Sequence, residues 1–297
     1  MNIGLIDVDG HNFPNMALMR LSAHHKTRGD NVEWWDGFKH YDRVYMSKVF
    51  TFSPDMDTCI NADETVRGGT GYKDYGNLPG SVEQTFPDYT MYPEWKPAIG
   101  VLTRGCIRNC PWCIVPKKEG MIRPAATWEQ IKRPDSRDII FMDNNVLAHD
   151  HGLDQIDRMG CENVRVDFNQ GLDARLITAQ TAKMLARLKW IRHIRMSCDT
   201  SAMIPVIEQA TAYLREAGVS PWRFWCYVLV QDVEEAHDRV LALDKMGITP
   251  FAQPYRDYDG GEPTIEQRRF ARWVNNKALF RSCEFSEMKG GTREAIM

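Results

Sequence analysis

The sequence lacks any apolar run approaching the roughly 18 residues that a membrane-spanning helix needs. Its start, MNIGLIDVDG, has no basic segment followed by an apolar core, so we expect no signal peptide. The net charge is only −3, so bulk electrostatics predicts no affinity for nucleic acid, although it does not exclude a local basic patch. These absences predict a cytoplasmic protein that has no membrane partner.

Cysteine is present, but its distribution does not suit a secreted disulfide framework. Three of the eight cysteines fall within eight positions, and no second cluster has ligand spacing. We expect the remaining cysteines to be small buried apolar residues rather than metal ligands. They are Cys59, Cys161, Cys198, Cys226 and Cys283.

Residues 1–95 predict a small α/β unit and a connector. Apolar runs predict strands over 3–6, 32–35 and 43–47, and an apolar-periodic stretch predicts a helix over 14–28 that stops at Gly29. This β-α-β-β order is that of a truncated Rossmann-like unit with parallel strands. Residues 68–97 contain many Gly, Pro, Asp and Tyr residues, which indicates an irregular but packed connector.

Residues 96–260 alternate between strand and helix patterns. The predicted strands cover 99–103, 138–142, 164–168, 193–197, 224–230 and 248–253. Six βα units predict an α/β fold with a parallel sheet and outer helices, and they fall short of the eight in a closed barrel. We therefore expect a partial (β/α)6 barrel, a partial TIM barrel, with its ligands at the carboxyl ends of the strands. Residues 261–297 predict a helical extension whose amphipathic helix, 266–281, plugs or flanks the barrel or contacts a partner protein.

The informative motif follows the first predicted strand of this barrel. Cys106, Cys110 and Cys113 have C-x3-C-x2-C spacing in one loop, so their thiolates can converge on one face of an iron–sulfur cube. A [4Fe-4S] cluster held in this way keeps one iron open to a small molecule. The alternative is zinc, but zinc modules pair two C-x2-C halves or add close histidines, and the nearest downstream histidine is His149.

The stretch TRGCIRNCPWCIVPKKEG, residues 103–120, resembles the radical S-adenosylmethionine (SAM) superfamily. It looks especially like the branch that holds methylthiotransferases and cobalamin-dependent radical SAM enzymes, and the resemblance covers roughly residues 95–258. It implies that the open iron binds SAM, whose reductive cleavage yields a 5′-deoxyadenosyl radical that abstracts hydrogen from a substrate. It also implies an electron donor such as flavodoxin or ferredoxin. The sequence does not identify the substrate.

Polar residues at the predicted strand ends are the candidates for the SAM site. The superfamily's usual Gly-Gly-Glu is absent after the second strand, so Asp143 and Asn145 would have to hold the SAM amine, with a turn cap as the alternative. The other candidates are Gln170 and Arg175 for the carboxylate or ribose, Ser197 and Asp199 for the ribose, and Gln253 for adenine or substrate.

Three further residues carry interpretations of their own. Trp112 can shield the cluster from water, and Asp173 can form a structural pair with Arg175 instead of leaving that arginine free for ligand. Cys198 is a candidate catalytic residue that would quench a substrate radical, with core packing as the alternative reading.

The front unit resembles a shortened cobalamin-binding domain, on residues 46–51 and the Gly-rich turn at 68–71. The Asp-x-His-x-x-Gly motif of histidine-ligating cobalamin proteins is broken, because Pro14 stands where glycine would follow Asp9 and His11. We expect less than one equivalent of cobalamin, and a lid formed by residues 72–95. Two alternatives stay open: a cobalamin-dependent radical SAM methyltransferase, and a metal-stabilised binding module without catalysis.

Overall fold

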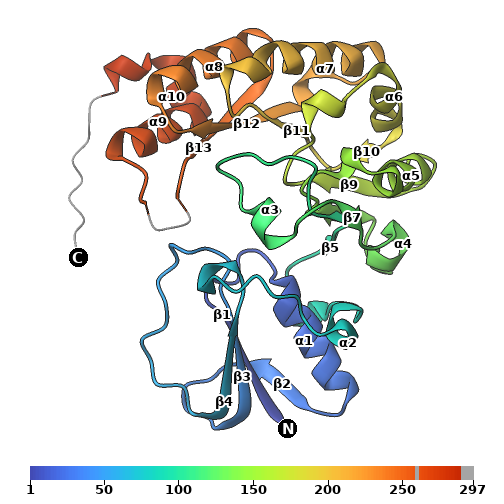
Figure 1. Cartoon of the computed structure of the whole chain (residues 1–297), viewed down its shortest axis with the longest axis vertical. Coiled ribbons are helices and arrows are strands. Elements are labelled where there is room, and N and C mark those ends of the chain that lie inside the picture. The colour runs from blue at the N-terminus through green and yellow to red at the C-terminus, as the bar shows by residue number, and fades with distance from the viewer. Residues whose placement is uncertain (258–260, 289–297) are drawn as a thin grey trace.

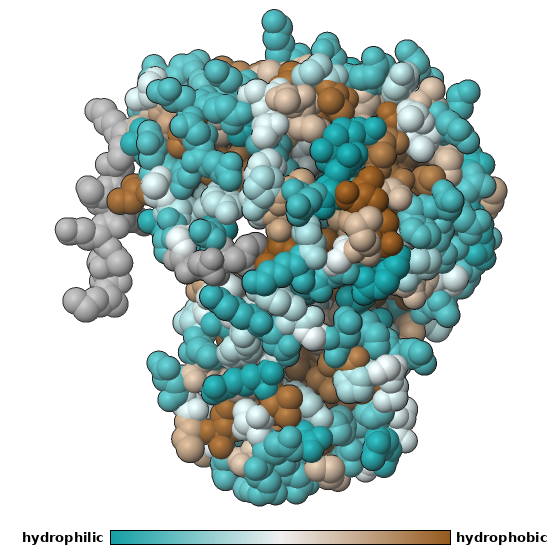
Figure 2. Space-filling model, viewed as in Figure 1, coloured by the Kyte–Doolittle hydropathy of each residue, from teal (hydrophilic) through white to brown (hydrophobic). Residues whose placement is uncertain are grey.

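The computed structural model describes residues 1–257 and 261–288, which form an α/β fold with parallel sheets (Figure 1). Residues 1–97, here called the front unit, contain one four-stranded sheet. The described residues from 98 onward, here called the second unit, contain a four-stranded and a three-stranded parallel sheet and a two-stranded antiparallel pair. Figure 2 shows these parts as two lobes with a mostly hydrophilic surface on the viewed face. Within the described residues, no helix has both the length and the apolar character that crossing a bilayer requires.

The front sheet has the order β2-β1-β3-β4, with every neighbouring pair parallel. Its elements are β1 (Asn2–Asp7), α1 (Met16–Thr27), β2 (Asn31–Trp34), β3 (Tyr41–Ser47) and β4 (Ala62–Gly68). Helix α1 begins where the Asn15 side chain accepts from Leu18 N, and it ends before Gly29, whose φ of +83° is left-handed. Its buried side chains Leu18 and Met19 pack on the apolar face of β1.

The prediction of three strands in this unit was incomplete, because β4 extends the sheet beside β3. Its sequence, ADETVRG, is largely exposed and has no apolar alternation, so the pattern carries no signal of a strand. The connector contains η1 (Thr70–Tyr72), α2 (Gly80–Glu83) and η2 (Tyr89–Met91). It is packed, since Val82, Met91 and Tyr92 are buried against the front sheet.

The second unit has a sheet of order β10-β9-β8-β5 and a sheet of order β11-β12-β13, all with parallel pairing. A single parallel bridge between Leu172 and Met196 joins the two sheets. The strands are β5 (Ala98–Gly100), β8 (Asp138–Phe141), β9 (Arg165–Phe168), β10 (Lys189–Trp190), β11 (Ile194–Ser197), β12 (Phe224–Val230) and β13 (Thr249–Pro254).

Helices cover one face of these strands (Figure 1). They are α4 (Trp128–Ile131), α5 (Asp150–Met159), α6 (Ala179–Arg187), α7 (Ile204–Glu216) and α8 (Val233–Lys245), and short η3 (Val146–Ala148), η4 (Ala174–Leu176), η5 (Ser201–Met203) and η6 (Pro221–Arg223) turns lie between elements. In β12, alternate residues are fully buried and the others only half-buried. One continuous apolar core therefore lies between strands and helices, while the opposite face is more open.

The predicted C-terminal helix over 266–281 is two helices, α9 (Ile265–Asn275) and α10 (Lys277–Ser282). The break occurs at Asn276, whose side chain accepts from Ala278 N and Leu279 N and so begins a second helix. Helix α9 buries Phe270 and Trp273 in the core, and the Trp273 indole donates to Cys283 O just before η7 (Phe285–Glu287). The extension thus flanks the sheet. The last predicted residues, 289–297, lie outside the described part of the chain.

Candidate metal centre

The three-cysteine segment is a loop closed at its base by backbone pairing. Strands β6 (Thr103–Arg104) and β7 (Arg123–Pro124) pair antiparallel, and Cys106 N donates to Gly120 O at 3.2 Å. Gly105 has a φ of +84°, and a Cβ there would lie 2.6 Å from Gly120 O. Only glycine fits this crossing, so the base of the loop has a fixed geometry.

A carboxylate inside the loop base adds to this closure. Glu119 Oε2 accepts from Gly105 N at 2.8 Å and from Asn144 Nδ2 at 2.7 Å. These bonds tie both ends of the loop to the residues that follow β8. Sequence reasoning missed Glu119, because it is the C-cap of the short helix α3 (Val115–Lys118), where no pattern marks a partner in another segment.

The cysteine side chains lie on the outer part of this loop. Cys106 and Cys110 are half-buried and Cys113 is exposed. The Cys106 sulfur accepts from Arg108 N at 3.3 Å and from Asn145 Nδ2 at 3.4 Å. The Cys106 sulfur is thus contacted both from within the loop and from the segment that follows β8.

Desolvation of the thiol raises the pKa of Cys110 and also that of Cys113, whose residue surface as a whole is exposed. The positive charge of Arg175 opposes this for Cys110, whereas the neighbouring cysteines raise both values further. The three thiols therefore lie close enough to influence one another. Within residues 1–257 and 261–288, however, no three His, Cys, Asp or Glu side chains converge as the ligands of one metal ion.

Asp143 does not occupy the position that the sequence prediction gave it. It is only 2% exposed, and its carboxylate accepts from Leu102 N at 3.0 Å, Thr103 N at 2.6 Å and Thr103 Oγ1 at 2.8 Å. Burial raises its pKa to about 6, in spite of these donors. Its oxygens are occupied by the chain that leads into the cysteine loop, so we correct its role from SAM contact to support of that loop.

Asn145 lies beside the cysteines, as predicted, and has an unused acceptor. Its Nδ2 donates to Cys106 Sγ and to Asp173 Oδ2, the latter at 3.2 Å. Its Oδ1 is buried and, in the described part of the chain, has no hydrogen-bond partner. A buried acceptor without a donor is costly, so this oxygen is a natural site for a ligand N–H group.

Arg175 is paired with Asp173, which was the structural alternative for this residue. Arg175 Nε lies 2.6 Å from Asp173 Oδ1, and Arg108 Nε lies 3.0 Å from Asp173 Oδ2. Burial would raise the pKa of Asp173, but the hydrogen bonds from Arg175 and Arg108 outweigh it and hold that pKa below its ordinary value. Asp173 thus joins Arg108 of the cysteine loop to the segment that follows β9. The sequence alone does not reveal this pairing of Arg108 with Asp173.

Trp112 and Asp199 are brought together by the fold. The Trp112 side chain hydrogen-bonds to Asp199, and Ser197 Oγ lies 3.5 Å from Asp199 Oδ2. Burial is the main reason that the pKa of Asp199 is raised. This contact attaches the outer part of the cysteine loop to the carboxyl end of β11.

The remaining predicted residues separate into exposed and buried positions. Gln170 and Gln253 are exposed at the carboxyl ends of β9 and β13. Cys198 is fully buried, and burial raises its pKa to about 12, so it is a neutral core thiol. A side chain without solvent or ligand access does not quench a substrate radical, and we therefore correct the catalytic reading of Cys198 to core packing.

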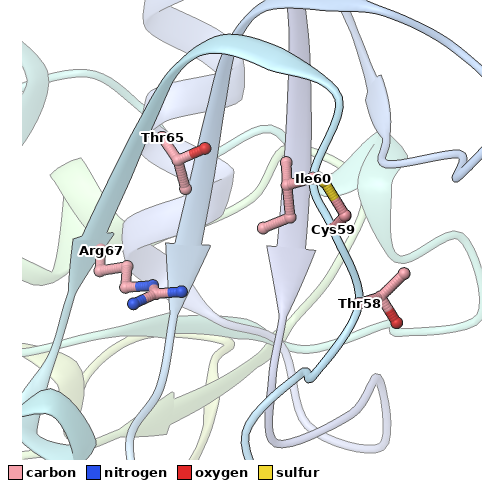
Figure 3. A pocket seen from close by; sticks show the side chains of 5 residues that line it. All are labelled: Thr58, Cys59, Ile60, Thr65 and Arg67. Atoms are coloured by element: carbon pink, nitrogen blue, oxygen red, sulfur yellow. The ribbon is translucent and has the colours of Figure 1, made fainter.

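A hollow of about 520 Å³ lies elsewhere, on the front unit (Figure 3). Thr65 and Arg67 of β4 line one side, and Thr58, Cys59 and Ile60 of the preceding segment line the other. None of these residues belongs to the cysteine loop. The hollow is open, and it contributes nothing to the candidate centre.

Comparison with known proteins adds no assignment: no protein-family model and no curated protein matches the sequence.

Proposed function

We propose that this protein is a radical SAM enzyme that holds a [4Fe-4S] cluster with Cys106, Cys110 and Cys113. The observation that carries the proposal is the position of the cysteine loop. It follows β5, at the carboxyl edge of the parallel strands, beside the unpartnered Oδ1 of Asn145. The carboxyl edge of a parallel sheet is where α/β enzymes place their ligands.

A second part of the proposal concerns the arrangement of the strands in the second unit. We propose that β5, β8, β9, β11, β12 and β13 form a partial (β/α)6 barrel. These strands follow one another in chain order, and the Leu172–Met196 bridge connects the two sheets in the same parallel sense. The half-buried face of β12 would then be the inner face, on which a substrate lies.

The donor set suits a cluster better than a single ion. Zinc holds its sulfur ligands about 2.3 Å from one atom, so the thiolates must crowd together. A cubane binds each thiolate to a different iron, which allows a wider spread. The thiols of Cys106, Cys110 and Cys113 lie close enough for their charges to influence one another, which is compatible with one cluster that gives each thiolate its own iron.

The cluster would supply an electron for the reductive cleavage of bound SAM, giving a 5′-deoxyadenosyl radical that abstracts hydrogen from the substrate. The chain's own residues bind and orient SAM. Asn145 Oδ1 accepts from the SAM ammonium group, and Ser197 and Asp199 accept from ribose hydroxyls. Gln170 and Gln253 reach the ligand from the solvent side, and Trp112 excludes water from the cysteine loop. A small reduced protein such as flavodoxin or ferredoxin is the proposed electron donor.

We propose that the front unit acts as a lid. Glu83 Oε1 of the connector lies 2.7 Å from Arg104 Nη2 at the base of the cysteine loop. On another side, the Arg256 guanidinium lies 4.0 Å from the ring centre of Phe52. The connector and the segment after β3 thus contact the second unit from two directions, which would restrict water and substrate to one approach.

We infer that the front unit does not hold cobalamin, which makes a cobalamin-dependent methyltransferase the second candidate. In a sheet of order β2-β1-β3-β4, a ligand is expected outside the carboxyl ends of β1 and β3. There, Tyr92 Oη donates to Asp7 Oδ2 at 2.8 Å and accepts from Asn15 N at 3.1 Å, while Asn15 Nδ2 donates to Ser47 Oγ at 2.8 Å. The connector's own tyrosine fills the place where a cobalamin tail would enter.

Anaerobic reconstitution with iron and sulfide tests the proposed function. We expect about four irons per chain, together with SAM-dependent formation of 5′-deoxyadenosine once a reductant is added. Replacing Cys106, Cys110 or Cys113 by alanine should abolish both. Cys59→Ala and Cys161→Ala are matched controls, since both cysteines are exposed outside the loop, and they should leave both unchanged. One tightly bound zinc per chain, with no iron, would contradict the proposal.

A further inference from the structure

An exposed tryptophan and three cations gather where β11 and β12 begin. Trp222 is 59% exposed and lies in the turn η6, directly before β12. The Arg223 guanidinium lies 4.4 Å from the centre of its ring, and Arg223 Nη1 donates to Arg192 O at 2.9 Å. That hydrogen bond holds the guanidinium against one face of the indole and leaves the rest of the ring to solvent.

The charge of this surface is uncompensated. Arg192 and Lys277 are exposed, and no carboxylate in residues 1–257 or 261–288 pairs with either of them or with Arg223. All three cations act on His193. The pKa of His193 is lowered to about 4, mainly by burial and next by the charges of Arg192 and Lys277. The ring is therefore neutral at pH 7, and the field around it is positive.

His193 also has an unused polar atom. It is 8% exposed, its Nδ1 is buried, and within the described residues this nitrogen has no hydrogen-bond partner. Its ring centre lies 6.5 Å from that of Trp222 and 4.8 Å from that of Trp225. A buried nitrogen without a partner is costly, so a polar group that reaches the ring beside Trp222 would remove that cost.

We propose that this surface, the Trp222 patch (Arg192, Trp222, Arg223 and Lys277), binds single-stranded nucleic acid. A base stacks on the free face of Trp222, and Arg192 and Lys277 contact phosphates. Surfaces that bind single strands combine cations along the backbone with aromatic stacking platforms, and they need no deep cavity. The carboxylates of an acidic peptide would use the cations but not the exposed indole, whereas a nucleotide uses both through its phosphate and its base. The small net charge of −3 is compatible with such binding, because the cations are concentrated locally.

The inference is independent of the proposed radical chemistry. The Trp222 patch lies at the amino ends of β11 and β12, whereas the cysteine loop follows the carboxyl end of β5. In parallel strands these are opposite edges. A bound strand would therefore anchor the protein to a nucleic acid without occupying the candidate metal centre.

Fluorescence anisotropy with labelled oligouridylate and oligothymidylate of about 12 nucleotides tests the proposal. We expect Trp222→Ala to weaken binding by roughly 5- to 150-fold, the range that loss of one stacked base gives. Arg192→Ser should reduce the slope of log affinity against log salt by about 0.7, as expected for one lost phosphate contact. The matched controls are Phe38→Ala, an aromatic that is 99% exposed on the front unit, and Lys183→Ser, an exposed cation on α6. Both should bind like the parent protein.

A competition experiment distinguishes a free nucleotide from a nucleic acid strand as the ligand. If unlabelled uridine monophosphate displaces the oligonucleotide at equal nucleotide concentration, the site takes a free nucleotide by the same chemistry. If only the strand competes, the ligand is the polymer. Equal binding by Trp222→Ala and its control, or a preference for polyglutamate or anionic vesicles over the oligonucleotide, would overturn the proposal. Absence of strand binding with normal deoxyadenosine formation would remove this inference and leave the proposed function intact.

Discussion

Replacing Asp143 by alanine removes the acceptor that organises the entry to the cysteine loop. Two backbone amides, of Leu102 and Thr103, and the Thr103 hydroxyl would lose their partner in a buried site. Each buried donor without an acceptor costs about 1–3 kcal/mol. The hydroxyl can turn to another acceptor, and single substitutions rarely exceed about 5 kcal/mol, so we expect unfolding to be easier by roughly 3–5 kcal/mol.

The same substitution should reduce the iron content. Thr103 begins β6, three residues before Cys106, and a disordered entry would no longer hold the first cysteine against Asn145. The assays are urea denaturation of the metal-free protein and iron per chain after anaerobic reconstitution. Asp138→Ala is the matched control, because Asp138 begins β8, the strand that Asp143 follows, and forms a surface pair with Arg165 at 2.6 Å. It should cost no more than about 1 kcal/mol and retain full iron.

The pH dependence gives a second measurement. Burial raises the pKa of Asp143 from 3.8 to about 6, so between these values the folded chain binds a proton that the unfolded chain has released. The unfolding free energy should therefore fall as pH rises from about 4 to about 6, by about 3 kcal/mol in total from this group. Asp143→Asn should remove this part of the slope. Parent-like stability and iron content in Asp143→Ala would refute the supporting role.

Three other substitutions or conditions have definite expected outcomes. Asn145→Ala should weaken SAM binding by roughly 10- to 150-fold in calorimetric titration while iron is retained. The reason is the loss of one charge-assisted hydrogen bond of about 1.5–3 kcal/mol. An unchanged titration curve would place the SAM amine elsewhere. Cys198→Ala should leave deoxyadenosine formation unchanged and lower the unfolding free energy by about 1 kcal/mol, and loss of activity in a stable variant would restore a catalytic role. Protein purified with cobalamin available should carry well below one equivalent of it and should cleave SAM without it, since Tyr92 is hydrogen-bonded to Asp7 at the carboxyl end of β1. A stoichiometric corrin spectrum after gel filtration would support the methyltransferase instead.

The longer strands of the second unit were predictable because each is a short apolar run bounded by turn residues, whereas the two-residue strands β6, β7 and β10 were not predicted. Strand β12, for example, is observed over the predicted range. The first strand is shorter than predicted, since β5 ends at Gly100 and the chain then leaves the sheet for β6. Strand β4 was not predictable, because its pairing with β3 is a backbone interaction and its side chains are mostly exposed.

The candidate site shows a different limit. The spacing of the three cysteines in the sequence groups them in one loop. The position of Asn145 after β8 led us to expect it at the same edge of the sheet, and its side chain contacts Cys106. The sequence position did not distinguish Asn145 from Asp143, which is two residues away and whose side chain turns back to Thr103. Which way a loop side chain turns depends on donors in another segment. Long-range partners such as Glu119 and Asp173 are hidden from the sequence for the same reason.

The base and the outer part of the cysteine loop depend on different interactions, and this has a consequence for metal binding. Asp143, Glu119 and the β6–β7 pair hold the base through the chain's own hydrogen bonds. The pKa values of the Cys110 and Cys113 thiols, in contrast, are raised by desolvation of the sulfur atoms, so these thiols are protonated at neutral pH. A metal binds thiolates, and its binding must release these protons. Iron uptake should therefore become more favourable as pH rises, in a loop whose base is already in place before the metal arrives.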